Sequence, residues 1–130
     1  MSEIITSPAN PALKRIRALE RRKEREAEGV FVAEGEGQIA RAVAGGWRCD
    51  TLVLREGHAP RDCMAWTKSH GARILTVPER LMVTLSGMEN APAMLAVIAQ
   101  RWADLPSKPE AKEIWIGLDR IRDPGNLVTI

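Results

Sequence analysis

The alternation of apolar and polar residues predicts strands and helices in turn over the first hundred residues. Short apolar runs bounded by turn residues are typical of buried strands. We expect such strands at residues 30–33, 47–54, 72–77 and 93–99. Helical periodicity is found between them, at residues 36–44, 61–70 and 79–85. This order of elements predicts an α/β domain with a layered architecture and a substantially parallel sheet.

A longer helix is predicted near the N-terminus, after a short polar arm at residues 2–11. Asn10 is a favourable N-cap, and Pro11 is tolerated at the first helical position because its missing N–H would be unpaired there anyway. Gly29 suits the left-handed conformation that ends many helices. We therefore expect one continuous helix from Pro11 to about Glu28.

The two faces of this predicted helix differ in character. At about 100° per residue, one face is apolar and carries Ala12, Leu13, Ile16, Leu19 and Ala27. Within roughly 80° of each other on the opposite face lie Lys14, Arg17, Arg21 and Arg25. Four cations in a line over about 16 Å can contact successive phosphates, and the arginine fork suits phosphate oxygens. The pattern makes these residues candidates for RNA contact.

The same cationic face also has an explanation that needs no ligand. Opposite charges at i,i+3, such as Arg17 with Glu20 and Arg21 with Glu24, are typical of a solvated helix. Like charges at i,i+4, such as Arg17 with Arg21 and Arg21 with Arg25, are unfavourable on an isolated helix and favour an anionic partner. From the helix alone, both interpretations stay open.

Composition limits the class of protein more than its function. Apolar residues make up 45% and charged residues 28% of the chain, which is typical of a packed domain and not of global disorder. The net charge of +2 does not by itself mark a nucleic-acid binder. Because no apolar stretch approaches the roughly 18 residues of a membrane span, we expect a soluble, cytoplasmic protein with no membrane partner.

The residues that could bind metal or form disulfides are few. Cys49 and Cys63 are widely spaced, form no CxxC motif and have no histidine at zinc-ligand spacing. We expect two buried reduced thiols, with a disulfide between them as the alternative. His58 and His70 have no metal-ligand spacing either, so no metal site is predicted.

Glu34 and the tryptophans each have two interpretations. Glu34 ends a predicted strand, so its carboxylate can cap the helix that follows or can serve an RNA-binding or structural role. With one phenylalanine, no tyrosine and four scattered tryptophans, a stacking platform of the RNA-recognition-motif type is not expected. We expect Trp47, Trp66 and Trp115 to be core or interface residues.

The composition changes after residue 100. Residues 101–112 contain Pro106, Pro109 and several charges, which is typical of a linker. Residues 113–118 are apolar and predict a new strand, followed by the turn sequence Asp123-Pro124-Gly125-Asn126. Because eighteen residues cannot build a core, we expect residues 113–130 to begin a second domain that is truncated here.

Two separated motifs in this chain resemble one known family, the SpoU-type methyltransferases of the SPOUT superfamily. The first motif comprises Ile5-Thr6-Ser7-Pro8-Ala9-Asn10-Pro11, the spacing of Lys14 to Leu19 and Lys23 to Arg25, and Gly29-Val30-Phe31-Val32-Ala33-Glu34-Gly35. The second, at the other end, is Leu118-Asp119 followed by Ile121-Arg122-Asp123-Pro124-Gly125-Asn126-Leu127. The likeness covers essentially all 130 residues in the family's order.

The resemblance implies an N-terminal substrate-binding domain that is a three-layer α/β/α sandwich, similar to RNA-binding domains of ribosomal proteins. It also implies a C-terminal knotted domain that binds S-adenosylmethionine, usually as a homodimer. The implied substrate is rRNA or tRNA, and the implied reaction is methyl transfer to a ribose 2′-hydroxyl.

For individual residues, the resemblance implies that Asn126 matches the asparagine of the family's active site. The accompanying arginine would lie beyond Ile130, as would the cofactor motifs, so no cofactor is expected for this chain alone. Val128 stands where the family usually has glycine. Because a β-branched residue does not readily adopt positive φ, either the backbone is ordinary there or the site is altered.

Together these observations predict a substrate-binding domain at residues 1–100, a linker at 101–112 and the start of a SPOUT domain at 113–130. The parent protein is expected to be an RNA 2′-O-ribose methyltransferase. The predicted RNA-binding residues are Asn10, Lys14, Arg17, Arg21, Arg25 and Glu34. The alternatives are a non-catalytic RNA-binding module and a protein-interaction domain whose cationic helix faces an acidic partner.

Overall fold

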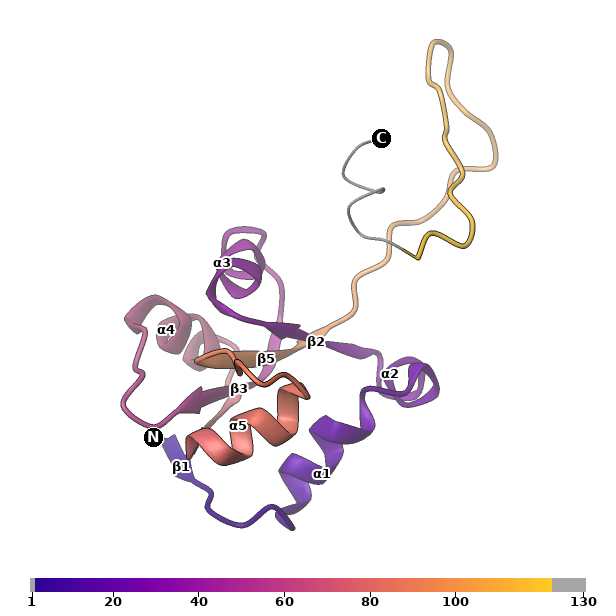
Figure 1. Cartoon of the computed structure of the whole chain (residues 1–130). Coiled ribbons are helices and arrows are strands. Elements are labelled where there is room, and N and C mark those ends of the chain that lie inside the picture. Colours follow the sequence, from indigo (N-terminus) through magenta and orange to yellow (C-terminus); the bar gives the residue numbers. More distant parts are fainter. Residues whose placement is uncertain (1, 123–130) are drawn as a thin grey trace.

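A mixed five-stranded sheet forms the centre of the molecule, with helices on both of its faces (Figure 1). A computed structural model describes residues 2–122 of the chain. The strands lie in the order β1-β4-β3-β5-β2, and their bounds are β1 Ser2–Ile4, β2 Val30–Glu34, β3 Cys49–Arg55, β4 Arg73–Val77 and β5 Met94–Ala99. The helices are α1 Pro11–Ala18, α2 Arg22–Glu28, α3 Glu36–Ala44, α4 Arg61–Ser69 and α5 Glu79–Ser86.

The core consists of two apolar layers, one on each face of the sheet. Leu13 and Ile16 of α1 pack with Leu81 and Met82 of α5 against one face. Helices α3 and α4 cover the other face, where Trp66 is among the buried residues. Figure 1 shows these two helix pairs on opposite sides of the strands. The predicted three-layer α/β/α sandwich is therefore confirmed.

The expectation of a substantially parallel sheet is only half right. Strand β4 pairs in parallel with β1 and β3, but β5 is antiparallel to both of its neighbours, β3 and β2. The reason lies in the connection before β5. Met94 begins β5 beside the residues where β2 and β3 end, and its carbonyl accepts a hydrogen bond from the Gly35 amide over 2.9 Å. The chain thus enters β5 at the edge where those strands finish, and it must run in the opposite direction.

The N-terminal arm contains a strand that its polar sequence did not predict. Ser2–Ile4 forms β1, which pairs with β4 at the edge of the sheet. The Glu3 carboxylate accepts a hydrogen bond of 2.6 Å from Arg73 Nη2, and the Ile5 amide donates to the Thr76 carbonyl over 2.9 Å. These partners lie about seventy positions away in the sequence, so no local pattern marks the strand.

The predicted long helix is two helices in the structure. Asn10 and Gly29 cap the ends as expected, but the chain leaves the helical conformation at Arg21, which has φ −80° and ψ 128°. Leu19, just before the break, is 1% exposed in the core. Helix α2 buries none of its residues. The like-charge i,i+4 pairs weaken a continuous helix, while burial of Leu19 holds the end of α1 against the sheet.

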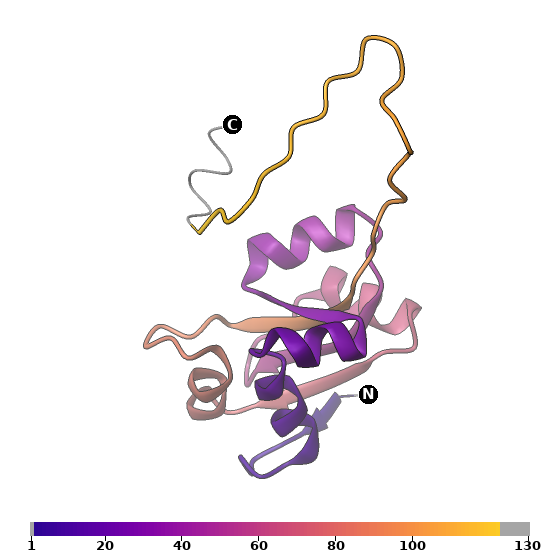
Figure 2. The ribbon, with the colours of Figure 1, turned by 90° about the vertical axis from the view of Figure 1, so that its right-hand side faces the viewer.

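The residues after β5 form no helix or strand within the described part of the chain. Residues 101–122 are exposed, and Figure 2 shows them as a long loop that leaves the sheet after β5 and turns back on itself. The predicted strand at 113–118 is absent, since a lone strand finds no neighbour for its backbone groups. Trp115, at 43% exposure, lies outside the core. The division into linker and second domain remains a prediction.

Both cysteines are buried free thiols, so the expected reduced state is confirmed and the disulfide alternative is wrong. Cys49 and Cys63 belong to the core layer beneath α3 and α4. Within residues 2–122, no helix has the length and apolar character needed to cross a membrane.

Arg15 joins three elements on the α1 side of the sheet. Its Nη1 atom lies 2.7 Å from Asp50 Oδ1 in β3, and its Nη2 atom lies 2.6 Å from Glu28 Oε2 in α2. Thr51 Oγ1 donates a second hydrogen bond of 2.7 Å to Asp50 Oδ1. Burial alone would raise the pKa of Asp50, but the hydrogen bonds from Arg15 and Thr51 outweigh it and lower that pKa.

This network predicts a stability effect that depends on pH. Asp50→Asn is expected to lower the free energy of unfolding at pH 7 by about 1 kcal/mol, because Arg15 loses an anionic partner. A carboxylate with a lowered folded-state pKa stabilises fully above its unfolded pKa and loses this contribution as the pH falls through the folded value. The deficit of the variant, measured by urea unfolding, should therefore shrink below about pH 3.8.

Asp104→Asn, in the exposed segment after β5, is the matched control and should show no deficit at either pH. A deficit of Asp50→Asn that stays constant into acid would contradict the proposed ionic contribution.

Candidate RNA-binding surface

The turn between β1 and α1 is built from local hydrogen bonds. The Asn10 side chain accepts a hydrogen bond from the Ala12 amide over 2.8 Å, and Pro11 follows it at the start of the helix. The Ser7 hydroxyl oxygen accepts from the Ala9 amide over 3.2 Å. Asn10 is therefore an N-cap in this structure, and its predicted RNA contact is a separate, untested role.

Two arginines from different helices hold this N-terminal arm from outside. Arg17 Nη2 of α1 donates to the Pro8 carbonyl over 2.6 Å, and Arg80 Nη2 of α5 donates to the Thr6 carbonyl over 2.7 Å. Within the described residues neither guanidinium forms an ion pair with a carboxylate. Sequence reasoning did not find Arg80, because only the packing of α5 beside α1 brings it to the arm.

The four predicted cations do not form one line, because the helix that would align them is broken. Lys14 and Arg17 belong to α1, and Arg25 belongs to α2. Arg21 lies at the break, 70% exposed, with its Nη2 atom 3.4 Å from Glu24 Oε1. Lys14 is exposed and has no ion pair within the described residues. Lys14, Arg17, Arg21 and Arg80, with the arm itself, make up what we call the arm surface.

Arg25 has a structural role at the end of α1. Its Nη1 atom donates to the carbonyl oxygens of Leu19 and Glu20 over 2.8 and 2.6 Å. These carbonyls are released by the break between α1 and α2, so Arg25 closes the end of α1. Its predicted phosphate contact stays a prediction.

Glu34 does not cap the following helix, and that interpretation was wrong. The N-cap of α3 is Gly35, and no side chain caps it. Because side chains alternate along β2, Glu34 points to the α1 face of the sheet while α3 covers the opposite face. There it lines a cavity of about 300 Å³ with Glu20 and Arg25. Its buried Oε2 atom has no hydrogen-bond partner, and burial followed by the charge of Glu20 raises its pKa.

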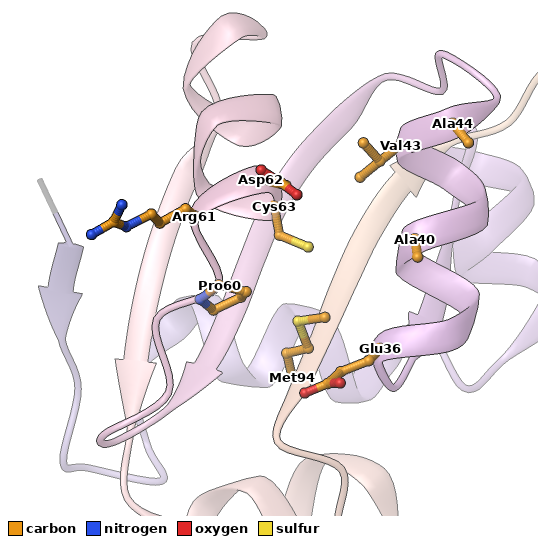
Figure 3. Close-up of a pocket in the computed structure, with 9 residues that line it drawn as sticks. All are labelled: Glu36, Ala40, Val43, Ala44, Pro60, Arg61, Asp62, Cys63 and Met94. Atoms are coloured by element: carbon orange, nitrogen blue, oxygen red, sulfur yellow. The ribbon is translucent and has the colours of Figure 1, made fainter.

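A cavity between α3 and α4 carries little chemistry. It measures about 640 Å³, with Ala40 and Val43 of α3 facing Cys63 of α4, as Figure 3 shows. Burial is the main cause of a raised pKa of the Cys63 thiol, so it is not an activated nucleophile. No group of three or more possible metal ligands occurs in the part of the chain that the structure describes. Asn126 and Val128 lie outside the described residues.

Comparison with known proteins identifies the family. A family model described as the MRM3-like substrate-binding domain matches residues 10–96, which run from the start of α1 into the first half of β5. Together with the fold, this match shows the class of protein: a substrate-binding domain of SpoU-type RNA methyltransferases. The chain belongs to the MRM3-like substrate-binding domain family. No curated protein matches the chain.

Solved structures agree with this assignment. An rRNA methyltransferase from Sinorhizobium meliloti is 31% identical, with a TM-score of 0.71 over 78% of this chain and 38% of that one. An RNA 2′-O ribose methyltransferase is 26% identical, with a TM-score of 0.70 over 95% of this chain and 48% of that one. The SpoU methyltransferase AviRb from Streptomyces viridochromogenes, at 23% identity and a TM-score of 0.57, covering 74% of this chain and 35% of that one, shares the fold. This chain spans less than half the length of each.

The cap predicts a stability effect that separates structure from ligand binding at Asn10. Asn10→Ala should lower the free energy of unfolding by about 1 kcal/mol, because the Ala12 amide loses its side-chain acceptor. Asn10→Ser restores an acceptor and should recover most of the loss in chemical denaturation. Equal losses in both variants would show that the amide of Asn10 acts through something other than the cap.

Proposed function

We propose that this chain is the RNA-binding part of an S-adenosylmethionine-dependent rRNA 2′-O-ribose methyltransferase. The observation that carries the proposal is the family match over residues 10–96. It is supported by three cations of the arm surface, Lys14, Arg17 and Arg80, which form no ion pair within the described residues. Two related solved structures are those of an AdoMet-bound rRNA methyltransferase and of an RNA 2′-O ribose methyltransferase. A catalytic domain beyond the residues in hand would supply the methyl transfer.

A separate docking domain suits the chemistry of this reaction. Methyl transfer needs the ribose 2′-oxygen in line with the sulfonium methyl, and positioning lowers the barrier by replacing a bimolecular encounter with a fixed geometry. Contacts far from the reacting atoms can provide the binding energy for this positioning. In this proposal residues 1–100 hold folded RNA, residues 101–112 link to the catalytic domain, and Asn126 belongs to its active site.

The arm surface is suited to phosphate because two of its cations are held in place and still have N–H groups for a ligand. Arg17 and Arg80 each use one nitrogen to hold the arm, and the other N–H groups of each guanidinium remain for a ligand. Lys14 is exposed and has no ion pair within the described residues, and Arg21 has only a contact of 3.4 Å to Glu24. Arginines that are already ordered lose little further conformational entropy when they bind phosphate oxygens.

Charge reversal on the arm surface tests this function. The double variant Lys14→Glu with Arg21→Glu should weaken binding to a structured rRNA hairpin by at least about tenfold at low salt. The slope of log affinity against log KCl should fall by about 2, since two phosphate contacts are lost. Fluorescence anisotropy over a series of KCl concentrations measures both. Neither residue holds the arm, so the fold should be unaffected.

Lys68→Glu is the matched control, an exposed lysine of α4 on the opposite face of the sheet. It should bind RNA like the parent chain. An equal loss in the control, or an unchanged salt slope in the double variant, argues against the arm surface and favours an acidic protein partner.

The proposal also predicts the behaviour of this chain toward the cofactor. Because the cofactor site is assigned to the domain beyond these residues, isothermal titration of the chain with S-adenosylmethionine should give no binding heat. A longer chain that includes a SPOUT catalytic domain should bind the cofactor. Micromolar or tighter binding of S-adenosylmethionine by the 130-residue chain would refute the assignment of the cofactor site to another domain.

A further inference from the structure

An aromatic pocket lies where the chain leaves the sheet. Gln100, Arg101 and Trp102 follow β5 directly, and they line a cavity of about 250 Å³ with Phe31 and Trp47. A second cavity of about 190 Å³ is lined by the same two rings together with Gln38 and Arg41 of α3. The pocket and the arm lie at opposite edges of the sheet, because Phe31 is on edge strand β2 and the arm follows the other edge strand, β1.

The inner wall of this pocket is fixed by packing. The rings of Phe31 and Trp47 meet edge to face, with centroids 5.7 Å apart at 86°. The guanidinium carbon of Arg101 lies 4.4 Å from the centroid of Trp47, and Arg101 Nη1 donates to the Gly45 carbonyl over 3.2 Å. A Cβ atom at Gly45 would lie 2.8 Å from the Trp47 ring, so glycine is required for this close approach. The wall is therefore preformed.

Trp102 forms the outer side and is 83% exposed. Its indole nitrogen donates to Gln100 Oε1 over 3.3 Å, while Gln100 Nε2 donates to the Val30 carbonyl over 3.2 Å. The backbone amide of Gln100 also donates a hydrogen bond to the Gly29 carbonyl over 2.7 Å. A large apolar ring is thus oriented by hydrogen bonds yet left in water, which is costly unless a ligand covers it.

The charges around the pocket select the kind of ligand. Its two cavities are lined by two arginines and two glutamines and by no carboxylate. The larger cavity between α3 and α4 differs, since Glu36 and Asp62 line it. Ligand pockets for whole small molecules have volumes of about 300 to 1,000 Å³, so the cavity beside Trp102 has room for a single planar group. Exposed aromatic rings beside arginine are how proteins hold unpaired nucleic-acid bases.

We propose that this pocket binds one unpaired RNA base, stacked on Trp102, with the adjoining phosphate near Arg41 and Arg101. The inference rests on the proposed function and adds a second, single-stranded contact to it. It differs from a sheet-face stacking platform, since the base enters beside the last residue of β5. The exposed Gln38 amide can donate to and accept from the edge of the base.

Tryptophan fluorescence of the 130-residue chain tests the inference with defined probes. Octaadenylate should quench the emission, and an abasic octamer with the same ribose-phosphate backbone should not, because only a base can stack. Trp102→Ala should weaken octaadenylate binding by about tenfold, measured by anisotropy of labelled RNA, and Trp102→Phe should restore it to within about threefold. Trp102 packs into no core layer, so both variants should fold.

Arg41→Met should weaken the binding of the octaadenylate probe and of the abasic probe alike, by about threefold, because the substitution removes a phosphate contact. Arg61→Met, an exposed arginine of α4, is the matched control and should change neither.

The outcomes separate this inference from the proposed function. Equal quenching by the abasic probe, or unchanged octaadenylate affinity in Trp102→Ala, overturns the base pocket even when charge reversal on the arm surface still weakens hairpin binding. If both probes and the hairpin fail to bind, the proposed function itself fails. A third outcome would assign the pocket to a second copy of the chain. In that case the parent chain self-associates in sedimentation, Trp102→Ala abolishes the self-association, and neither chain responds to RNA.

Discussion

Burial of the two central strands on both of their faces is the constraint on which the rest of the structure depends. Leu52 and Leu54 of β3 face the layer under α3 and α4, while Val53 between them faces α1 and α5. Strand β5 alternates in the same way, and its residues from Met94 to Ile98 are at most 2% exposed. Because neither face can be left in water, the fold needs helices on both sides, and the sheet edges and loops are left for function.

Both surfaces that we connect with RNA lie at such margins. The arm follows edge strand β1, where Arg17 and Arg80 reach it from two helices. The aromatic pocket lies beside the other edge strand, β2, where Arg101 packs on Trp47. The rigid sheet keeps these two margins in a fixed relation, so one RNA that contacts both would be held in a defined orientation. A docking domain for a positionally demanding reaction needs this property.

Two charged residues show how the fold changes the meaning of a sequence pattern. Arg25, a predicted phosphate contact, also closes the end of α1 by hydrogen bonds to two backbone carbonyls. Glu34 was a candidate helix cap, but the alternation of β2 turns it away from α3 and leaves one buried oxygen without a partner. The sequence shows which kinds of contact a charged residue can form. Which of these contacts it does form depends on the residues that lie near it in the folded structure.

The sequence by itself determined the local elements that rest on periodicity and caps: the order of helices and strands from residue 30 to 99, the Asn10 cap and the Gly29 stop. Contacts between distant residues decided the rest. Strand β1 exists through pairing with β4, β5 is antiparallel because of where the chain enters it, and burial of Leu19 helps to divide the first helix. Such contacts leave no periodic trace, because their energy depends on partners that only the folded chain brings together.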